Sequence, residues 1–275
     1  GDSPLLVYDD PVENLIYRDF DCLLTVRAPH DAFELSDVPM ELRRRREESR
    51  KPLRDIFSER SASGALRWCI CQYPAPSSAA LSGMDTGAYA DFIAGAVHLD
   101  REDPGDYWRE LSAKQERIAR WLDERRTLRF VAEGTDLSCS VAGRRWINSD
   151  GRRNMPSGEI FTAPVEGSVE GHITFSFPGV YMDREVANIR LVFSGGAVSE
   201  AYAEKGIDVL EELLKIDGAR VPGGVAIGTN YGITHFSRNI LFDEKIGGTM
   251  HLALGDSYGE CGGTNRSVVH WDLIA

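Results

Sequence analysis

The chain has 275 residues, of which 43 are acidic and 31 basic, so its formal net charge at pH 7 is −12. This length suits one large or two smaller domains, and a content of 42% apolar residues is enough for a globular core. The acidic balance argues against a nucleic-acid-binding protein, because phosphate neutralisation needs clustered lysine and arginine. The sequence shows neither a run of about 18 uncharged apolar residues nor a secretory signal, so we expect no membrane span and no export.

The cysteines indicate a reducing compartment. There are five of them, which is an odd number; Cys69 and Cys71 are separated by one residue and the others are scattered. This spacing fits neither a disulfide framework nor a zinc ribbon. We therefore expect a soluble cytoplasmic protein with reduced thiols.

Residues 1–127 predict an α/β domain. Short apolar runs at 5–8 and 22–26 are followed by turn-forming residues, as in the buried strands of α/β layers. A polar helical pattern covers 39–50, and the strongest helical pattern covers 103–126, where an Asp-Pro pair marks the start. Side chains at 3.6-residue spacing predict the buried face of this second helix, with both tryptophans in the core: Trp108, Leu111, Gln115, Ile118, Trp121 and Leu122.

Residues 128–275 predict a second, β-rich α+β domain. The pattern there changes to period two, which predicts strands at 128–131, 137–141 and 172–177. A hairpin of 189–193 and 198–202 is expected around Gly195-Gly196, followed by a helix at 207–215. Glycine pairs at 223–224, 247–248 and 262–263 predict turns.

The most informative local pattern for chemistry is His270-Trp271-Asp272. Residues i and i+2 of a strand point to the same face, so the imidazole and the carboxylate converge as ligands of a divalent metal would. The run 249–252 alternates in the same way, and a glycine-rich return would bring His251 beside His270. A His-x-Asp pair alone is more often a surface hydrogen bond, so this pattern by itself does not establish a metal site.

Glu159 is the second candidate residue. It lies in the apolar, proline-bracketed segment 154–164, and burial of a carboxylate favours an acid/base role or a metal ligand. No nucleophile elbow, phosphate-binding loop or dinucleotide-binding glycine motif stands between a predicted strand and a helix, which argues against those enzyme classes.

Several longer segments resemble one known family. The segments 154–164, 227–233 and 239–255 occur in order, followed by 262–265 and 270–272. Together they resemble the aminopeptidase T/aminopeptidase S family of metallo-aminopeptidases, and shorter segments at 64–68 and 99–104 extend the similarity weakly into the first half. The resemblance implies a two-metal exopeptidase that forms a homodimer. It also implies a Rossmann-like N-terminal α/β domain, here shortened at its start, and a C-terminal metal-binding domain.

The resemblance also implies roles for particular residues. By position, four residues match metal ligands of the family: Glu159, His251, His270 and Asp272. The resemblance also makes Glu159 a catalytic residue, together with Tyr258, which matches a tyrosine that assists the reaction. One or two ions of Zn, Co, Mn or Mg would activate the water that attacks the N-terminal peptide bond. Tyr258 would donate a hydrogen bond to the developing oxyanion.

One of the implied ligands is missing. The family usually has Gly-Glu before Ile-Gly-Thr-Asn, whereas this chain has Gly223-Gly224, so Gly224 offers no ligand side chain. Two neighbouring divalent ions repel each other and carboxylates normally offset that repulsion, so we expect a weakened second metal site. The residues considered as replacements are Glu244, Glu260 and His235.

Two other functions remain open at this point. A ring-cleaving enzyme of the 2,5-dihydroxypyridine dioxygenase type resembles the same family and holds a single Fe(II), for which His251, His270 and Asp272 would provide two histidines and one carboxylate. Against it, one histidine of that group aligns with Gly224. Another diverged reaction on the same fold belongs with this alternative. The other function is that of a non-catalytic binding protein on the same scaffold. Metal content separates the aminopeptidase, the Fe(II) enzyme and the non-catalytic binding protein. The expected partner is a peptide or small-molecule substrate rather than nucleic acid or membrane.

Overall fold

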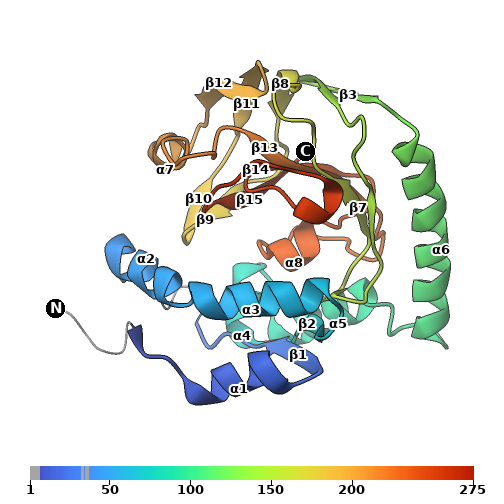
Figure 1. Ribbon diagram of the computed structural model, residues 1–275. Helices are drawn as coiled ribbons and strands as arrows, with labels where there is room; N and C mark the ends of the chain where they lie inside the picture. The colour runs from blue at the N-terminus through green and yellow to red at the C-terminus, as the bar shows by residue number, and fades with distance from the viewer. Residues whose placement is uncertain (1–6, 32–33, 35–36) are drawn as a thin grey trace.

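The first part of the chain forms a small parallel sheet with helices around it (Figure 1). The computed structural model describes residues 7–31, 34 and 37–275. Strand β2 pairs in parallel with β1 on one side and with the short strand β6 on the other. The elements are α1 (Pro11–Asp19), β1 (Cys22–Arg27), α2 (Met40–Ser49), α3 (Lys51–Ala62), β2 (Arg67–Gln72), α4 (Pro76–Leu81), α5 (Thr86–Ala96), α6 (Pro104–Asp123) and β6 (Asn154–Met155).

The expected strand at 22–26 and the helices at 39–50 and 103–126 are confirmed as β1, α2 and α6. The expected burial of that strand is wrong, because Leu24 and Val26 are exposed at the edge of the sheet. The first half of the strand expected at 5–8 lies outside the described residues, and the prediction of a strand at residues 7–8 was wrong. Val7 and Tyr8 are exposed and not in a strand. They lead instead into α1, where the Asp10 side chain caps the first turn and Pro11 occupies the first helical position.

The second part contains two five-stranded sheets, with strand orders β12-β11-β8-β4-β3 and β15-β14-β13-β7-β5. The mixed α/β class is confirmed, and the division at 127/128 remains a prediction. The elements are β3 (Thr127–Ala132), β4 (Thr135–Ser140), β5 (Ile147–Ser149), β7 (Glu159–Thr162), β8 (Glu170–Thr174), β9 (Gly179–Tyr181), β10 (Arg184–Val186), β11 (Arg190–Ser194), β12 (Ala197–Tyr202), α7 (Ile207–Leu213), β13 (Pro222–Gly228), α8 (Ile240–Asp243), β14 (Met250–Gly255) and β15 (His270–Ile274).

Glycine patterns predicted the turns at 195–196, 247–248 and 262–263 correctly and one turn wrongly. The β11–β12 hairpin is confirmed, and Gly195 and Gly196 both have positive φ, as a tight hairpin turn requires. The turn expected at 223–224 is wrong, because these residues lie inside strand β13. A Cβ on Gly223 would stand 2.1 Å from the carbonyl oxygen of Asp256, so glycine marks a close backbone approach here.

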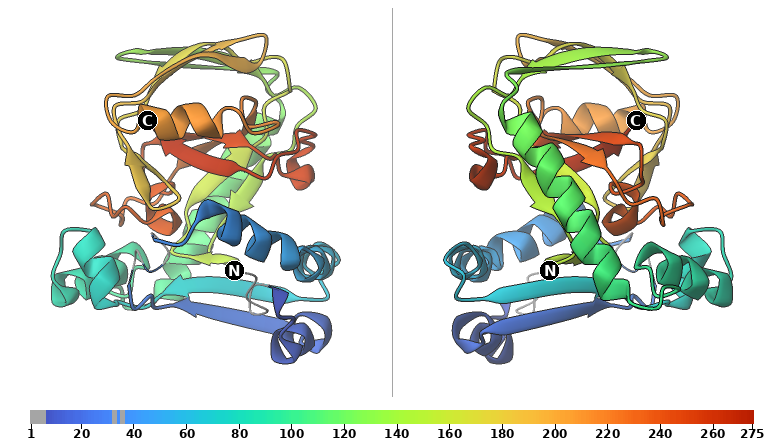
Figure 2. Two further views of the ribbon diagram at one scale, coloured as in Figure 1. Left: turned by 90° about the vertical axis from the view of Figure 1, so that its left-hand side faces the viewer. Right: turned by 90° about the vertical axis from the view of Figure 1, so that its right-hand side faces the viewer.

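Helix α6 connects the two parts of the molecule (Figure 2). It runs diagonally past the sheets, and its Ala119 and Leu122 join the core that also includes residues from both five-stranded sheets. Trp121 was wrongly expected in that core: it is 57% exposed, and the Arg125 guanidinium lies over its ring. Over the described residues, no helix has the length and apolar character needed to span a membrane.

Candidate metal centre

The sheet β15-β14-β13-β7-β5 has one apolar face and one face that opens into a pocket of about 680 Å³. Alternation along each strand separates the two faces. The apolar face packs into the core through Ile160, Val225, Leu252, Leu254, Trp271 and Leu273. The intervening residues line the pocket: Glu159, Phe161, Gly224, Ala226, His251, Ala253, His270 and Asp272. The pairing of β14 with β15 therefore brings His251 to the same face as His270 and Asp272, as the sequence patterns predicted.

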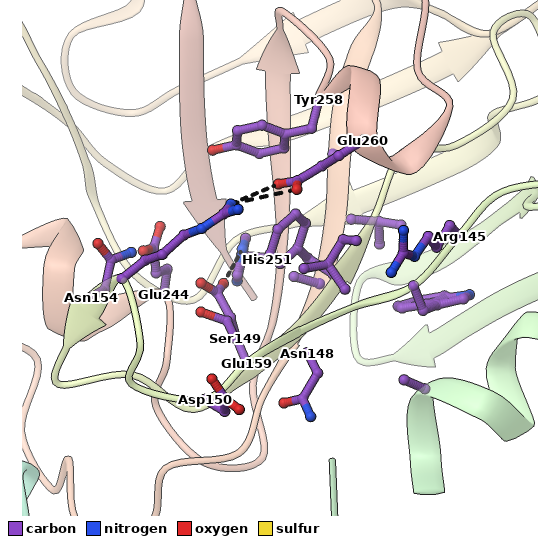
Figure 3. A pocket seen from close by; sticks show the side chains of 18 of the residues that line it. Arg145, Asn148, Ser149, Asp150, Asn154, Glu159, Glu244, His251, Tyr258 and Glu260 are labelled. Atoms are coloured by element: carbon purple, nitrogen blue, oxygen red, sulfur yellow. Dashed lines mark hydrogen bonds and ion pairs between the residues drawn. The ribbon is translucent and has the colours of Figure 1, made fainter. Parts of the chain in front are cut away.

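The four residues predicted as metal ligands lie together on this face. The Nε2 atom of His251 is 3.4 Å from Oε2 of Glu159 (Figure 3) and 3.9 Å from Oδ1 of Asp272. The other oxygen of Asp272 lies 3.5 Å from Nε2 of His270. These groups form a nearly continuous row of ligand atoms, which is buried at Glu159 and His251 and opens to solvent at His270.

The hydrogen bonding of the two imidazoles fits a bound cation. His270 Nδ1 lies 2.8 Å from the carbonyl oxygen of Asp256, which can only accept, so Nδ1 is the donor and Nε2 is the ring nitrogen available to a metal ion. The Nδ1 atom of His251 is buried without a hydrogen-bond partner in the described part of the chain. Lone pairs and carboxylates facing one another at these distances are the donor set of a divalent metal site.

Glu244 joins this cluster from outside the sheet. It directly follows the short helix α8, whose Leu241 and Phe242 are fixed in a second core with Tyr89. Ligand atoms of Glu159, Glu244 and His251 all lie within 4.8 Å of one another. Burial, together with the nearby negative charges, raises the pKa of Glu244 to about 8 despite the opposing effect of Lys245.

Lys245 is a site residue that sequence reasoning missed. Its side chain is fully buried, donates to Glu244 and places Nζ 3.7 Å from Oε1 of Glu159. Burial lowers the pKa of Lys245, but Glu244, Glu159 and Asp272 outweigh that effect, so the pKa is raised overall. In the sequence, three consecutive charged residues at 243–245 look like an ordinary solvated turn, and no local signal indicates that they are buried.

Gly224 lies on the ligand face, where the sequence resemblance implied a missing ligand. A Cβ added there would be 3.4 Å from the Cβ of Ala253 and 4.0 Å from Cε1 of His270, so a side chain would enter the pocket without striking backbone. Of the other residues considered as replacements, Glu260 lines the pocket and pairs with Arg153. His235 lies elsewhere, with Nε2 3.0 Å from the carbonyl oxygen of Ser82.

Tyr258 stands at the pocket on the side opposite Glu159 (Figure 3). It is partly exposed, and its ring packs at centroid distances of 4.9 Å from His270 and 5.3 Å from Phe161. Loss of water around its hydroxyl, followed by the negative charge of Asp272, raises the pKa of Tyr258 well above its ordinary value. The hydroxyl therefore stays protonated at neutral pH and is available as a hydrogen-bond donor.

Gln115 of α6 supports the site from behind. Its buried amide nitrogen lies 2.6 Å from Oδ1 of Asn148, 3.0 Å from the carbonyl oxygen of Ser149 and 3.1 Å from that of Glu159. Its oxygen accepts a hydrogen bond of 2.7 Å from the Thr229 hydroxyl. The sequence predicted that Gln115 faces inward, but not that it positions the backbone of a ligand residue.

Comparison with known proteins places the chain in a family. Residues 8–275 match the family model described as thermophilic metalloprotease (M29). The chain belongs to this family. Aminopeptidase T of Thermus thermophilus is 35% identical over 210 residues, and aminopeptidase AmpS of Bacillus subtilis is 30% identical over 208 residues. Each of these alignments covers 65% of this chain and 50% of the relative, so the chain spans about half the length of the curated relatives it matches.

Solved structures agree with this assignment. The structure of wild-type AmpT from Thermus thermophilus superposes with a TM-score of 0.80 at 26% identity, covering 95% of this chain and 72% of that one. A 2,5-dihydroxypyridine dioxygenase from Pseudomonas putida KT2440 matches with a TM-score of 0.50 at 14% identity, over 92% of this chain and 86% of that one. The second likeness shows a shared fold alone. Membership of a metalloprotease family supports dependence on a divalent metal.

Proposed function

We propose that the protein is a metal-dependent aminopeptidase that removes the N-terminal residue of peptides. The observation that carries this proposal is the row of Glu159, His251, Asp272 and His270 on the floor of a pocket, in a member of a metalloprotease family. These four residues would hold the metal, and a bound Zn, Co, Mn or Mg ion supplies Lewis-acid polarisation of the scissile carbonyl and a water of lowered pKa. Several relatives are named aminopeptidases, which supports the same reaction class.

The residues of the pocket explain a preference for a free N-terminus. The carboxylates of Glu159, Glu244 and Asp272 lie on the floor, and a carboxylate oxygen that does not bind the metal can accept a hydrogen bond from the α-ammonium group of a peptide. The protonated hydroxyl of Tyr258 donates a hydrogen bond to the oxyanion that develops on the scissile carbonyl.

The experiment that tests this function is hydrolysis of aminoacyl-anilides by the metal-loaded protein. Chelation should abolish the activity, and Zn, Co or Mn should restore it. Tyr258→Phe should lower kcat by about 10²–10³-fold with metal content unchanged, since it removes one donor to the oxyanion. A rate near that of the unmodified protein would exclude the role of Tyr258, whereas metal-loaded protein inactive on every anilide and peptide tested would exclude the function.

The ring-cleaving alternative has weaker support. Its structural likeness, at 14% identity, concerns the fold alone. His251, His270 and Asp272 are a ligand set that Fe(II) also accepts, so the discriminating measurement is O₂ consumption with a dihydroxypyridine after anaerobic Fe(II) loading. We expect no ring cleavage.

Assembly and compartment complete the proposal. We propose a homodimer on the basis of the family resemblance, and a monomeric mass by light scattering at micromolar concentration would exclude it. We propose the cytoplasm as the compartment because all five cysteines are free thiols, a state that reducing conditions maintain.

A further inference from the structure

Lys245 lies inside the carboxylate cluster and is fixed there. Its side chain is 0% exposed and contacts both Glu244 and Glu159. Its backbone is held as well, since its N–H donates to the carbonyl of Phe242 and its carbonyl accepts from the buried Asn230. Moving the ammonium away would leave the buried Glu159 and the half-buried Glu244 without their positively charged partner, so Lys245 is a permanent cation of this site.

The charge of the cluster suits one divalent ion. Glu159, Glu244 and Asp272 contribute three negative charges when ionised, and Lys245 contributes one positive charge, so these four side chains have a net charge of −2. One divalent ion balances this charge. A second would leave two uncompensated positive charges in a buried pocket.

The arrangement of metal-ligand atoms also indicates a single divalent ion. On the β13 side of the pocket, Gly224 and Ala226 carry no ligand atoms, and neither does Ala253 next to them on β14. Within the described residues, one group of three or more potential ligands converges closely, and it consists of Glu159, Glu244 and His251. His270 lies beside the space next to Gly224, but strand β13 adds no carboxylate there, so a second ion would lack the ligand that offsets its charge.

We propose that this chain holds one tightly bound divalent ion, and that Lys245 takes the place of a second ion as the other positive charge of the centre. This inference rests on the proposed metal-dependent function and narrows it to a mononuclear site. It makes Lys245 a positioning residue that holds Glu159 and Glu244 in place for the single ion.

The test is metal stoichiometry, measured on apo protein by calorimetric titration with Co(II) and by elemental analysis after dialysis. The unmodified protein should bind one ion tightly. Gly224→Glu adds a donor and a negative charge next to His270, so it should bind a second ion at least tenfold more tightly than the unmodified protein does. Gly224→Gln adds a donor without the charge and should stay at one ion.

Lysine variants test the charge argument independently. Lys245→Met should promote binding of a second ion, whereas Lys245→Arg, which keeps the charge, should not. Lys215→Met is the control, because Lys215 lies on the surface and pairs with Glu212. Circular dichroism checks folding, and if Lys245→Met does not fold, the comparison of the two Gly224 variants decides.

The outcomes separate this inference from the proposed function. Two equally tight ions in the unmodified protein would overturn the mononuclear centre and leave the aminopeptidase proposal standing. A Gly224→Glu variant that stays at one ion would overturn the argument that the missing carboxylate at Gly224 excludes the second ion. Failure of the unmodified protein to bind Zn, Co or Mn would overturn both.

Discussion

Gln115 offers a direct measure of how strongly α6 supports the metal-binding sheet. Its side chain is fully buried, and its amide bonds to Asn148, Ser149, Glu159 and Thr229. Gln115→Met keeps the length and the helix propensity of the side chain but removes every one of these hydrogen bonds.

The magnitude follows from the number of bonds that can form at once. An amide nitrogen has two hydrogens, so it satisfies two of its three acceptors, and the bond from Thr229 makes three bonds in total. A buried partner left unsatisfied costs about 1–3 kcal/mol, and the half-buried Asn148 and Thr229 recover part of this by contact with water. We therefore expect the free energy of unfolding to fall by about 2–4 kcal/mol.

Urea denaturation followed by circular dichroism measures this change. Lys114→Met is the matched control, because Lys114 is the exposed preceding residue of the same helix and its substitution should change the free energy of unfolding by less than about 0.5 kcal/mol. We also expect Gln115→Met to weaken metal binding about tenfold, since the Glu159 backbone loses its support. A destabilisation below about 1 kcal/mol, with unchanged metal affinity, would refute the reasoning.

Two further predictions concern stability. Gly223→Ala should lower the free energy of unfolding by about 3 kcal/mol, because its Cβ would overlap the carbonyl oxygen of Asp256. Gly224→Ala is the control and should change the free energy of unfolding by less than about 0.5 kcal/mol. Urea denaturation measures both, and equal effects of the two substitutions would contradict this prediction. For Glu166, burial alone would raise the pKa, but hydrogen bonds from Thr264 outweigh it and lower the pKa to about 2. The stabilisation by ionised Glu166 is therefore complete above about pH 4.5 and is lost as the pH falls toward 2. Glu166→Gln should lower the free energy of unfolding by about 2 kcal/mol at pH 7 and by little at pH 2. Urea denaturation at both pH values checks this difference.

The sequence by itself determined the features that depend on neighbouring residues. The alternation around His251 and along 270–272 predicted that these side chains share one face with their apolar neighbours on the other, and β14 and β15 have that arrangement. The period of 3.6 residues predicted α6. The predicted buried face of this helix included both Trp121 and Leu122. Adjacent residues on a helix point about 100° apart, so only Leu122 reaches the core.

The tertiary structure alone decided which charged residues belong to the centre. Glu244 and Lys245 lie in the cluster because α8 is anchored through Phe242 against Tyr89 and Phe92, residues about 150 positions earlier in the chain. Gly223 is a strand residue because two distant backbone segments approach each other there. Which segments meet depends on contacts between distant parts of the chain, so a local pattern predicts the apolar face of an element but not its partner or the burial of a charged turn.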